Sequence, residues 1–375
     1  MKFVVSSAIL NSRLQILDKV VVGKNVSPLD DCFLFEIRDG QMNVTATDRE
    51  NVMRSSIVLE ESEGDGSFAV QHRTILDAVK ELDEQPLLFE VDTETYSMEV
   101  TYVNGKYKFA GMDPEGFMEA PEVGDGATVV TLPAVTLSDT ISRTLFAVGQ
   151  DPIRQVMNGI YFDITPECLA IVSSDGHKLV RNRIDSLGSD TPASFILPKK
   201  PAAMLKNVLA KDGGDAVVKF NKSIAEITFD GGSLICRLIE GAYPKYNSVI
   251  PEANPNRILV DRVSMIGALR RVLPFASQST HLVRLHMETG RVVVSSEDVD
   301  FAASAREEVL CDYDGQTMDI GFKGTALLDI LTVMDGREVV IQLADPSRAG
   351  TIVPAVQQEG GDVLMLLMPM LLNDY

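Results

Sequence analysis

Apolar residues along the chain follow a strand-then-helix pattern that returns three times. A strand-like opening centred on Val5 recurs at Leu132 and Val260, at offsets of 127 and 128 residues. Behind each opening, apolar residues are spaced by three or four, which predicts an amphipathic helix packed on a core. These positions are Leu10, Leu14 and Leu17, then Leu137, Ile141 and Leu145, then Met265, Leu269 and Val272. Self-similarity at a fixed period indicates a tandem repeat.

A second strand-and-helix pattern also occurs three times, beginning at Phe68, Phe195 and Ile320. Its apolar positions superpose as Ile75, Ala78 and Leu82, then Ala202, Leu205 and Leu209, then Leu327, Ile330 and Met334. Between the two helices of each repeat lies a strand that ends in an acidic turn. We place these turns at Asp48, Asp175 and Glu297. Three landmarks in the same order make chance a poor explanation.

The remaining apolar segments are short and bounded by turn residues, which predicts many antiparallel strands in each repeat. The fold class is therefore α+β, with two helices on an antiparallel sheet in each of three tandem units. Segments rich in Gly, Pro, Asn and acidic residues at 122–128 and 251–257 mark the joints. The predicted domains are 1–121, 128–250 and 258–375. The predicted helices fall within 7–24, 71–82, 136–147, 198–211, 262–273 and 321–333.

Composition narrows the class of protein. Of the 375 residues 45% are hydrophobic and 23% are charged, which is typical of a globular chain. Four scattered cysteines predict neither a disulfide framework nor a zinc site, so we expect a reducing compartment, no metal and no cofactor. The longest apolar stretch, 363–372, is too short to span a bilayer, and we expect a soluble, cytoplasmic protein without a membrane partner.

The positive charge of this acidic chain is concentrated in the predicted helices. The formal net charge is -20, yet the six helix windows hold 14 Lys and Arg against 5 Asp and Glu. Such segregation suits contact with a polyanion on one face, although lysines that merely solvate exposed helices are the alternative. With no Trp and 6% aromatic residues, base stacking is disfavoured, and sequence-independent contact with the phosphates of duplex DNA fits better.

One segment, Ser173–Leu179 ("SSDGHKL"), has the composition of a catalytic centre. A hydrolase using Ser174, Asp175 and His177 is therefore one hypothesis. However, a triad needs three groups that converge from separate parts of a fold, and the acid at 175 belongs to the repeat. The chain also lacks the GxxxxGK[ST] loop of a nucleotide-driven machine. We therefore predict no catalytic residues and no enzyme activity.

Four segments carry a resemblance to a known family. They are 150–159 ("QDPIRQVMNG"), 175–179 ("DGHKL"), 243–251 ("YPKYNSVIP") and 368–370 ("MPM"). Together with the three repeats, they resemble the β sliding clamp family of bacterial DNA polymerase III. The resemblance implies a homodimeric, head-to-tail ring of six clamp domains that encircles duplex DNA, with helices lining the hole. It further implies a non-enzymatic processivity factor, loaded by a partner ATPase.

The resemblance also implies three sets of site residues. Short linear peptides from the replicative polymerase, the clamp loader and repair proteins would bind a hydrophobic pocket formed by Met157, Ser174, Gly176, His177, Leu179, Pro244, Val249, Leu367, Met368, Pro369 and Met370. DNA contacts would come from Lys24, Gln150, Lys199 and Lys200. The dimer interface would pair Tyr107 and Phe109 with Leu273 and Phe275.

Several points stay open at the level of sequence. His177 serves equally well as a polar anchor for a peptide or as a structural turn residue. We interpret "MPM" as a pocket wall, with a buried terminal strand as the alternative. The chain departs from the family at Asn247, Ser248 and Leu371, where basic residues are frequent, and in its final Asn373–Tyr375. A three-domain scaffold that binds peptides but no DNA is the third hypothesis.

Overall fold

The computed structural model describes residues 1–21, 27–124, 126–210 and 213–372. The chain forms two compact units, each described here by itself. The first unit contains Met1–Ser138 and Lys200–Leu238, and the second contains Asp139–Lys199 and Ile239–Tyr375. The second sequence repeat therefore contributes strands to both units. The domain boundaries 1–121, 128–250 and 258–375 remain a prediction.

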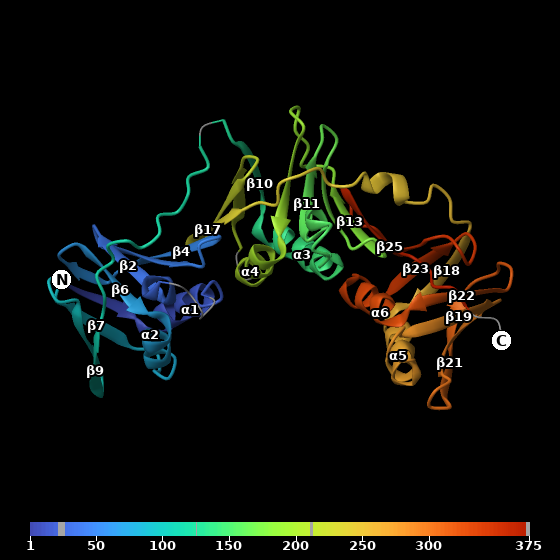
Figure 1. The fold of residues 1–375 in the computed structure, drawn as a ribbon, viewed down its shortest axis with the longest axis horizontal. Helices are drawn as coiled ribbons and strands as arrows, with labels where there is room; N and C mark the ends of the chain where they lie inside the picture. Colours follow the sequence, from blue (N-terminus) through green and yellow to red (C-terminus); the bar gives the residue numbers. More distant parts are fainter. Residues whose placement is uncertain (22–26, 125, 211–212, 373–375) are drawn as a thin grey trace. The chain divides into compact units, whose positions relative to one another are not determined.

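All three repeats have the same order of elements (Figure 1). The first contains β1 (Lys2–Ser6), α1 (Ser7–Leu17), β2 (Cys32–Arg38), β3 (Gln41–Thr47), β4 (Asn51–Val58), β5 (Glu61–Glu63), β6 (Gly66–Gln71), α2 (His72–Val79), β7 (Pro86–Val91), β8 (Ser97–Tyr102) and β9 (Gly105–Ala110). The second contains β10 (Thr128–Pro133), α3 (Ala134–Thr144), β11 (Gly159–Ile164), β12 (Leu169–Ser174), β13 (Lys178–Ile184), β14 (Ala193–Pro198), α4 (Lys199–Leu209), β15 (Asp215–Phe220), β16 (Ile224–Phe229) and β17 (Gly232–Arg237).

The third repeat contains β18 (Asn256–Asp261), α5 (Arg262–Val272), β19 (Leu282–Glu288), β20 (Arg291–Asp298), β21 (Ala303–Asp312), β22 (Met318–Lys323), α6 (Gly324–Val333), β23 (Glu338–Leu343), β24 (Gly350–Pro354) and β25 (Gly361–Leu367). Short 3₁₀ turns, η1 (Pro28–Asp31), η2 (Leu145–Ala147), η3 (Gln155–Met157), η4 (Tyr246–Val249) and η5 (Leu273–Phe275), connect these elements. The predicted α+β repeats are confirmed.

Antiparallel pairing runs across the joints between repeats within each unit. In the first unit, an eight-stranded sheet has the order β10-β15-β16-β17-β4-β3-β2-β6, beside a five-stranded sheet β5-β1-β7-β8-β9. In the second unit, a twelve-stranded sheet has the order β14-β11-β12-β13-β25-β24-β23-β18-β21-β20-β19-β22. Strand β17 thus pairs with β4, and β13 pairs with β25, which satisfies backbone groups that would otherwise be edges.

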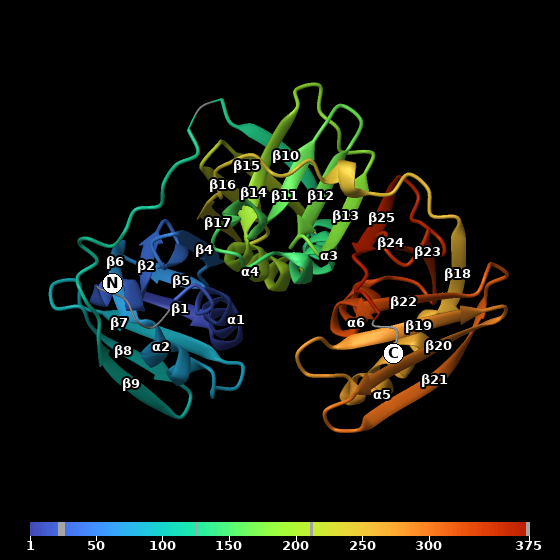
Figure 2. The ribbon, with the colours of Figure 1, turned by 45° about the vertical axis from the view of Figure 1, so that its right-hand side comes forward.

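The helices form where the apolar spacing predicts, although α1 is shorter than its window. Helix α1 ends at Leu17 instead of near residue 24, because the β-branched run that begins at Val20 disfavours helix. Its first turn is capped by the Ser6 hydroxyl, which accepts from the Ile9 amide at 3.3 Å. In the third repeat, α5 and α6 pack against the sheet together (Figure 2). No helix of the described residues is long and apolar enough to cross a bilayer.

The acidic turns are structural elements of the repeat. The Asp175 carboxylate accepts from the amides of His177 at 2.8 Å and Lys178 at 2.9 Å, and from Lys178 Nζ at 2.6 Å. Asp48 accepts in the same way from the amides of Glu50 at 3.0 Å and Asn51 at 2.6 Å. These Asx turns join successive strands, which explains why an acid recurs there.

The third acidic turn lies one residue later than the sequence indicates. Asp298, and not Glu297, accepts from the amides of Asp300 at 3.1 Å and Phe301 at 3.3 Å. Buried serines fix the same alignment, because Ser173 donates to Thr144 O at 2.6 Å and Ser296 donates to Val272 O at 2.9 Å. Ser296 is thus the counterpart of Ser173, and Asp298 that of Asp175. The longer turn after β20 hides this correspondence in the sequence.

We predict that Asp175→Ala lowers the free energy of unfolding by about 1–3 kcal/mol at pH 7, because it leaves two amides and an ammonium without their acceptor. Partial burial raises the pKa of the Asp175 carboxyl, but hydrogen bonds from Lys178 and His177 outweigh burial and hold the pKa below its ordinary value. This stabilisation is present above the unfolded-state pKa of about 4 and is lost as pH falls through the lower folded-state pKa. Urea titrations of both proteins at pH 7 and pH 3 measure it, and a difference that grows on acidification would contradict the prediction.

Candidate functional site

The chain after β25 connects the Asp175 turn with the third repeat. The Met368 amide donates to the His177 carbonyl at 2.8 Å, and the Met370 amide donates to the Gly321 carbonyl at 2.8 Å. Strand β25 is buried at its last three residues, 365–367, whereas Met368 just beyond it is 41% exposed. Gly321 permits the approach, since a Cβ there would lie 2.7 Å from the Met370 carbonyl oxygen. "MPM" is therefore a surface segment held in place at both ends.

The structure brings together two of the predicted pocket segments, the Asp175 turn and the chain at 367–370, and it buries some of the predicted residues. Met157, Ser174, Leu179 and Leu367 are buried. Gly176, His177, Pro244, Val249 and Met368 are exposed, and Pro369 and Met370 are half-buried. The buried members support the site, and the exposed members are the ones that a ligand can touch. Val249 and Met368, at 56% and 41% exposed, are the apolar side chains among the latter.

The Ser174, Asp175 and His177 side chains are not arranged for nucleophilic catalysis. The Ser174 hydroxyl donates to Lys178 O at 2.8 Å and accepts from the Gly176 amide at 3.1 Å. The Asp175 carboxylate is occupied by the turn amides and by Lys178. Within the described residues, no hydrogen bond joins the His177 ring to either side chain. The segment is a closed turn that presents the His177 ring to solvent.

Tyrosines that the sequence did not single out support the exposed segment. The rings of Tyr161 and Tyr243 stack with centroids 4.6 Å apart, and the Tyr246 hydroxyl donates to Asp163 Oδ2 at 2.9 Å. Burial raises the pKa of both Tyr243 and Tyr246, so these phenols stay neutral. They belong to an apolar cluster with Leu179 that holds the 243–249 segment on the sheet. The sequence feature that points to these tyrosines is the "YPKY" segment, which shows two of them but cannot show their stacking.

Arg154 is a further residue that sequence reasoning did not assign. Its Nε donates to Asp151 Oδ2 at 2.9 Å, and its Nη2 donates to the Asp175 carbonyl at 3.4 Å. Gly176 has φ +92°, and a Cβ there would lie 2.8 Å from Arg154 Nη1. Glycine is thus required both for the turn and for the guanidinium above it. This arginine places a cation, itself paired with Asp151, beside the Asp175 turn.

The predicted DNA-contact residues have different environments. Lys200, which begins α4 with Lys199, donates to the Val20 carbonyl at 3.0 Å and pairs with Asp48. It therefore ties the first repeat to the second. Lys199 and Gln150 are exposed, and in the described part of the chain Lys199 makes no ion pair. Lys24 lies outside the described residues.

The basic charge is concentrated in two helices. Counted over the observed helices, nine Lys and Arg stand against three Asp, and six of the nine lie in α4 and α5. In α5, Arg262 donates to the carbonyls of Leu331 at 3.0 Å and Gly336 at 2.8 Å, and Arg271 pairs with Glu307. Lys199, Lys206 and Arg270 are then the cations of these helices without an ion pair in the described residues.

Two strand edges, one in each unit, are the counterparts of the edges that pair at the joints but have no such partner among the described residues. Strand β9 ends the five-stranded sheet, and β21 pairs on one side with β18 only at Cys311 and Asp312. Tyr107 and Phe109 lie on β9 and are half-buried, while Leu273 and Phe275 form η5 beside β21.

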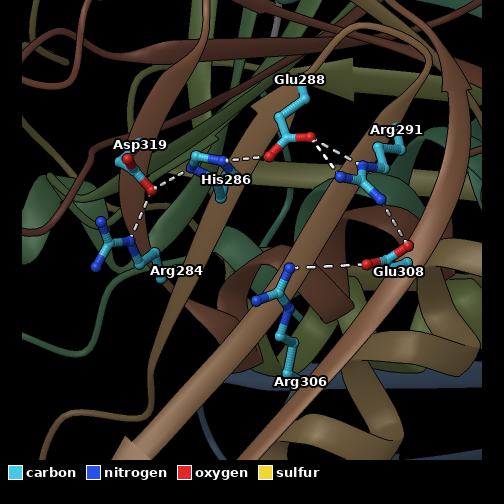
Figure 3. A network of polar contacts seen from close by, with 7 residues as sticks. All are labelled: Arg284, His286, Glu288, Arg291, Arg306, Glu308 and Asp319. Carbon is cyan, nitrogen blue, oxygen red and sulfur yellow. Dashed lines mark hydrogen bonds and ion pairs between the residues drawn. The ribbon is translucent and has the colours of Figure 1, made fainter.

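A network of ion pairs anchors β21 in its sheet (Figure 3). It links Asp319, Arg284, His286, Glu288, Arg291, Glu308 and Arg306 across β22, β19, β20 and β21. Both nitrogens of the His286 ring lie 2.9 Å from carboxylate oxygens, of Asp319 and Glu288. The ring thus bridges the two carboxylates, one on β22 and one on β19. The open edge of β21 is thus held by charges on one face of the sheet.

Comparison with known proteins matches the whole chain. Family models of the DNA polymerase III beta subunit match its N-terminal domain at residues 1–121, its central domain at 131–245 and its C-terminal domain at 247–370. The beta sliding clamp of Pseudomonas putida is 25% identical over 373 residues, covering 99% of this chain and 100% of that protein. The beta sliding clamp of Escherichia coli (strain K12) is 27% identical over 372 residues, covering 97% and 99%.

Solved structures share the fold. The Pseudomonas aeruginosa sliding clamp bound to griselimycin has a TM-score of 0.93 at 24% identity, covering 99% of this chain and 100% of that one. The Bartonella birtlesii clamp bound to griselimycin has a TM-score of 0.91 at 24% identity, with the same coverage. Because the family models together cover most of the chain, this protein belongs to the DNA polymerase III beta subunit family and is a sliding clamp, not an enzyme.

Proposed function

We propose that two copies of this chain close head to tail into a six-domain ring around duplex DNA and tether partner proteins through the exposed segment at Met368. The observation that carries the proposal is the repeated pairing at the joints, β4 with β17 and β13 with β25. In the repeat, β21 is the counterpart of β4 and β13, and β9 is the counterpart of β17 and β25. The third joint therefore pairs β21 of one copy with β9 of another.

Glycines at the joints support this pairing. A Cβ on Gly232 would lie 2.4 Å from the carbonyl oxygen of Arg54, and one on Gly361 would lie 2.2 Å from that of Arg183. Both glycines open their strands and allow close approach of the facing backbone. Their counterpart is Gly105, which opens β9 and has only the Tyr102 ring beside its Cβ position. Glycine is thus retained at the edge where our proposal places the backbone of a second copy.

Charge and apolar contact also match at the third joint. Arg73 occupies the position of Lys200 in the repeat, and Asp298 that of Asp48, so the Lys200 pair with Asp48 predicts that Arg73 pairs with Asp298 of the other copy. The two existing joints place Tyr107 opposite Glu307 or Ala305. Those residues lie on the face of β21 that packs on α5, where Leu273 and Phe275 complete an apolar contact with Phe109.

We further propose that the exposed apolar residues around Met368 capture short linear peptides from polymerase, clamp loader and repair proteins. Methionine and valine offer surfaces that adapt to several partners, and His177 and Arg154 add polar anchors. The joint between β13 and β25 differs from the joint between β4 and β17 in how its acidic turn is covered. Thr325 stands where Lys200 stands in the second repeat, so the Asp175 turn is not covered by a lysine from the next repeat.

The four cysteines of the chain are free thiols, which favours a cytoplasmic location.

The ring predicts a topological, sequence-independent hold on DNA. After loading by its partner ATPase, the clamp is expected to remain on closed circular duplex through a wash at high salt and to leave the same duplex once it is cut. Phosphate contacts alone would be lost on both substrates, because they weaken steeply with salt. Gel filtration of loaded DNA before and after linearisation measures this. Equal retention on cut and closed DNA would reject encirclement, and absence of retention on both would favour the peptide-binding scaffold.

Peptide capture at the exposed segment makes a separate prediction. Met368→Ala and Val249→Ala should each weaken binding of griselimycin, the ligand of the related structures, by about 5-fold to 30-fold, because each removes buried apolar contact worth about 1–2 kcal/mol. Isothermal titration measures the affinity. Val58→Ala, at a side chain 81% exposed in the first repeat, is the matched control and should leave affinity unchanged. Equal affinities for all four proteins would place the ligand elsewhere.

The glycine at the open edge gives a third prediction. Gly105→Val should speed exchange of subunits between dimers by at least about 10-fold, because a side chain there meets the backbone of the second copy. Energy transfer between differently labelled copies measures the exchange. Gly124→Val is the control, since nothing lies within 4 Å of a Cβ at Gly124. Equal exchange for the two variants would show that β9 is not the joining edge.

A further inference from the structure

The first joint contains a small cavity between helices α1 and α4, which we name the α1–α4 cavity. Its volume is about 270 Å3. Five of its lining residues can donate hydrogen bonds, and they are Ser12, Arg13, Gln15, Lys19 and Asn207. The apolar side chains of Ile16 and Val208 also line the cavity. A donor-rich concavity with two cations has the chemistry of an anion site.

The two cations of the cavity are held without a carboxylate partner. Neither Arg13 nor Lys19 makes an ion pair with any residue that the structure describes. The Arg13 guanidinium lies against the turn before β17, where a Cβ on Gly231 would be 2.4 Å from Arg13 Nη2. Gly231 has φ +72°, so the turn both requires glycine and leaves room for the guanidinium. Arg13 is therefore half-buried at the joint and its charge is uncompensated.

In the other two repeats, the equivalent helix carries an arginine that pairs with a carboxylate. At the position of Ile16, one helical turn from Arg13, the second repeat has Arg143 and the third has Arg271. Arg143 pairs with Asp335, and Arg271 pairs with Glu307. The first repeat has the apolar Ile16 at this position, and its cations Arg13 and Lys19 line the cavity without an ion pair to a described residue. Desolvating an unpaired charge costs free energy, so a retained unpaired arginine at a joint indicates an anionic ligand.

We infer that the α1–α4 cavity binds a phosphate group. The guanidinium of Arg13 can donate two parallel hydrogen bonds to phosphate oxygens, Lys19 adds a point charge, and the hydroxyl and amides supply further donors. One carboxylate, Asp230, also lines the cavity and makes an interaction of its own, so two cations outweigh one anion. The phosphate can be a diester of the encircled duplex, a source that rests on the proposed function, or a free phosphate group.

The test compares the dimeric protein with a variant that carries Arg13→Gln and Lys19→Gln. Its control carries Lys222→Gln and Arg257→Gln, which remove the same charge from exposed positions outside the helices. Thermal unfolding is measured in inorganic phosphate and in chloride at equal ionic strength, since a ligand that binds the native state raises Tm. The unmodified protein and the control should gain stability in phosphate, and the cavity variant should lose that gain while keeping the Tm in chloride.

A second arm identifies the source of the phosphate. Equilibrium binding to linear duplex is measured at several salt concentrations, and loss of one phosphate contact lowers the slope of log affinity against log salt by about 1. A lower slope for the cavity variant than for the control supports a backbone phosphate. A phosphate-dependent Tm gain that the variant loses, with equal slopes, supports a free phosphate group. Equal Tm gains in variant and control overturn the inference. Failure of retention on circular DNA would remove the proposed ring but leave the phosphate-dependent Tm gain standing.

Discussion

Backbone hydrogen bonding across the joints is the constraint on which the whole arrangement depends. Each repeat ends on a strand that pairs inside the repeat on one side only, and its other edge must be paired or protected. The chain pairs it twice, between β4 and β17 and between β13 and β25, with a glycine at the closest approach each time. The third pair of such edges, β9 and β21, lies in the first and third repeats, and in the proposed ring a second molecule supplies the partner strand. Assembly of the ring then uses the same backbone hydrogen bonding between strand edges that joins the repeats within one chain.

The distribution of charge follows from that architecture. A chain with a net charge of -20 places most of its helical cations in α4 and α5, while nearly all its acids lie outside the six helices. Several of these cations are already bonded within the protein: Lys200 pairs with the Asp48 carboxylate, and Arg262 donates to the Leu331 carbonyl near the end of α6. The cations that remain unpaired are few, which suits a protein that must hold DNA loosely enough to slide. The helical cations thus divide into those that are paired, such as Lys200 and Arg271, and those without an ion pair in the described residues, such as Lys199 and Arg270.

Sequence reasoning predicted the repeat, the six helices and the strand-rich units, because apolar spacing follows directly from the faces that helices and strands bury. It misjudged the third acidic turn by one residue, since a longer turn after β20 carries adjacent acids and only the buried Ser296 fixes the alignment. The pocket residues came from resemblance, and periodicity could not have separated buried Leu179 from exposed Val249. The stacked Tyr161 and Tyr243, and Arg154 over Gly176, depend on contacts between distant segments that no local pattern encodes.

The central claim is that the open edges of β9 and β21 close between two copies. Light scattering of the unmodified protein without DNA, over a range of dilutions, tests it most directly. The account predicts a mass near twice 40.9 kDa that persists on dilution to low micromolar concentration. A stable mass of 40.9 kDa would leave both edges unpaired, remove encirclement as the basis of processivity and contradict the account.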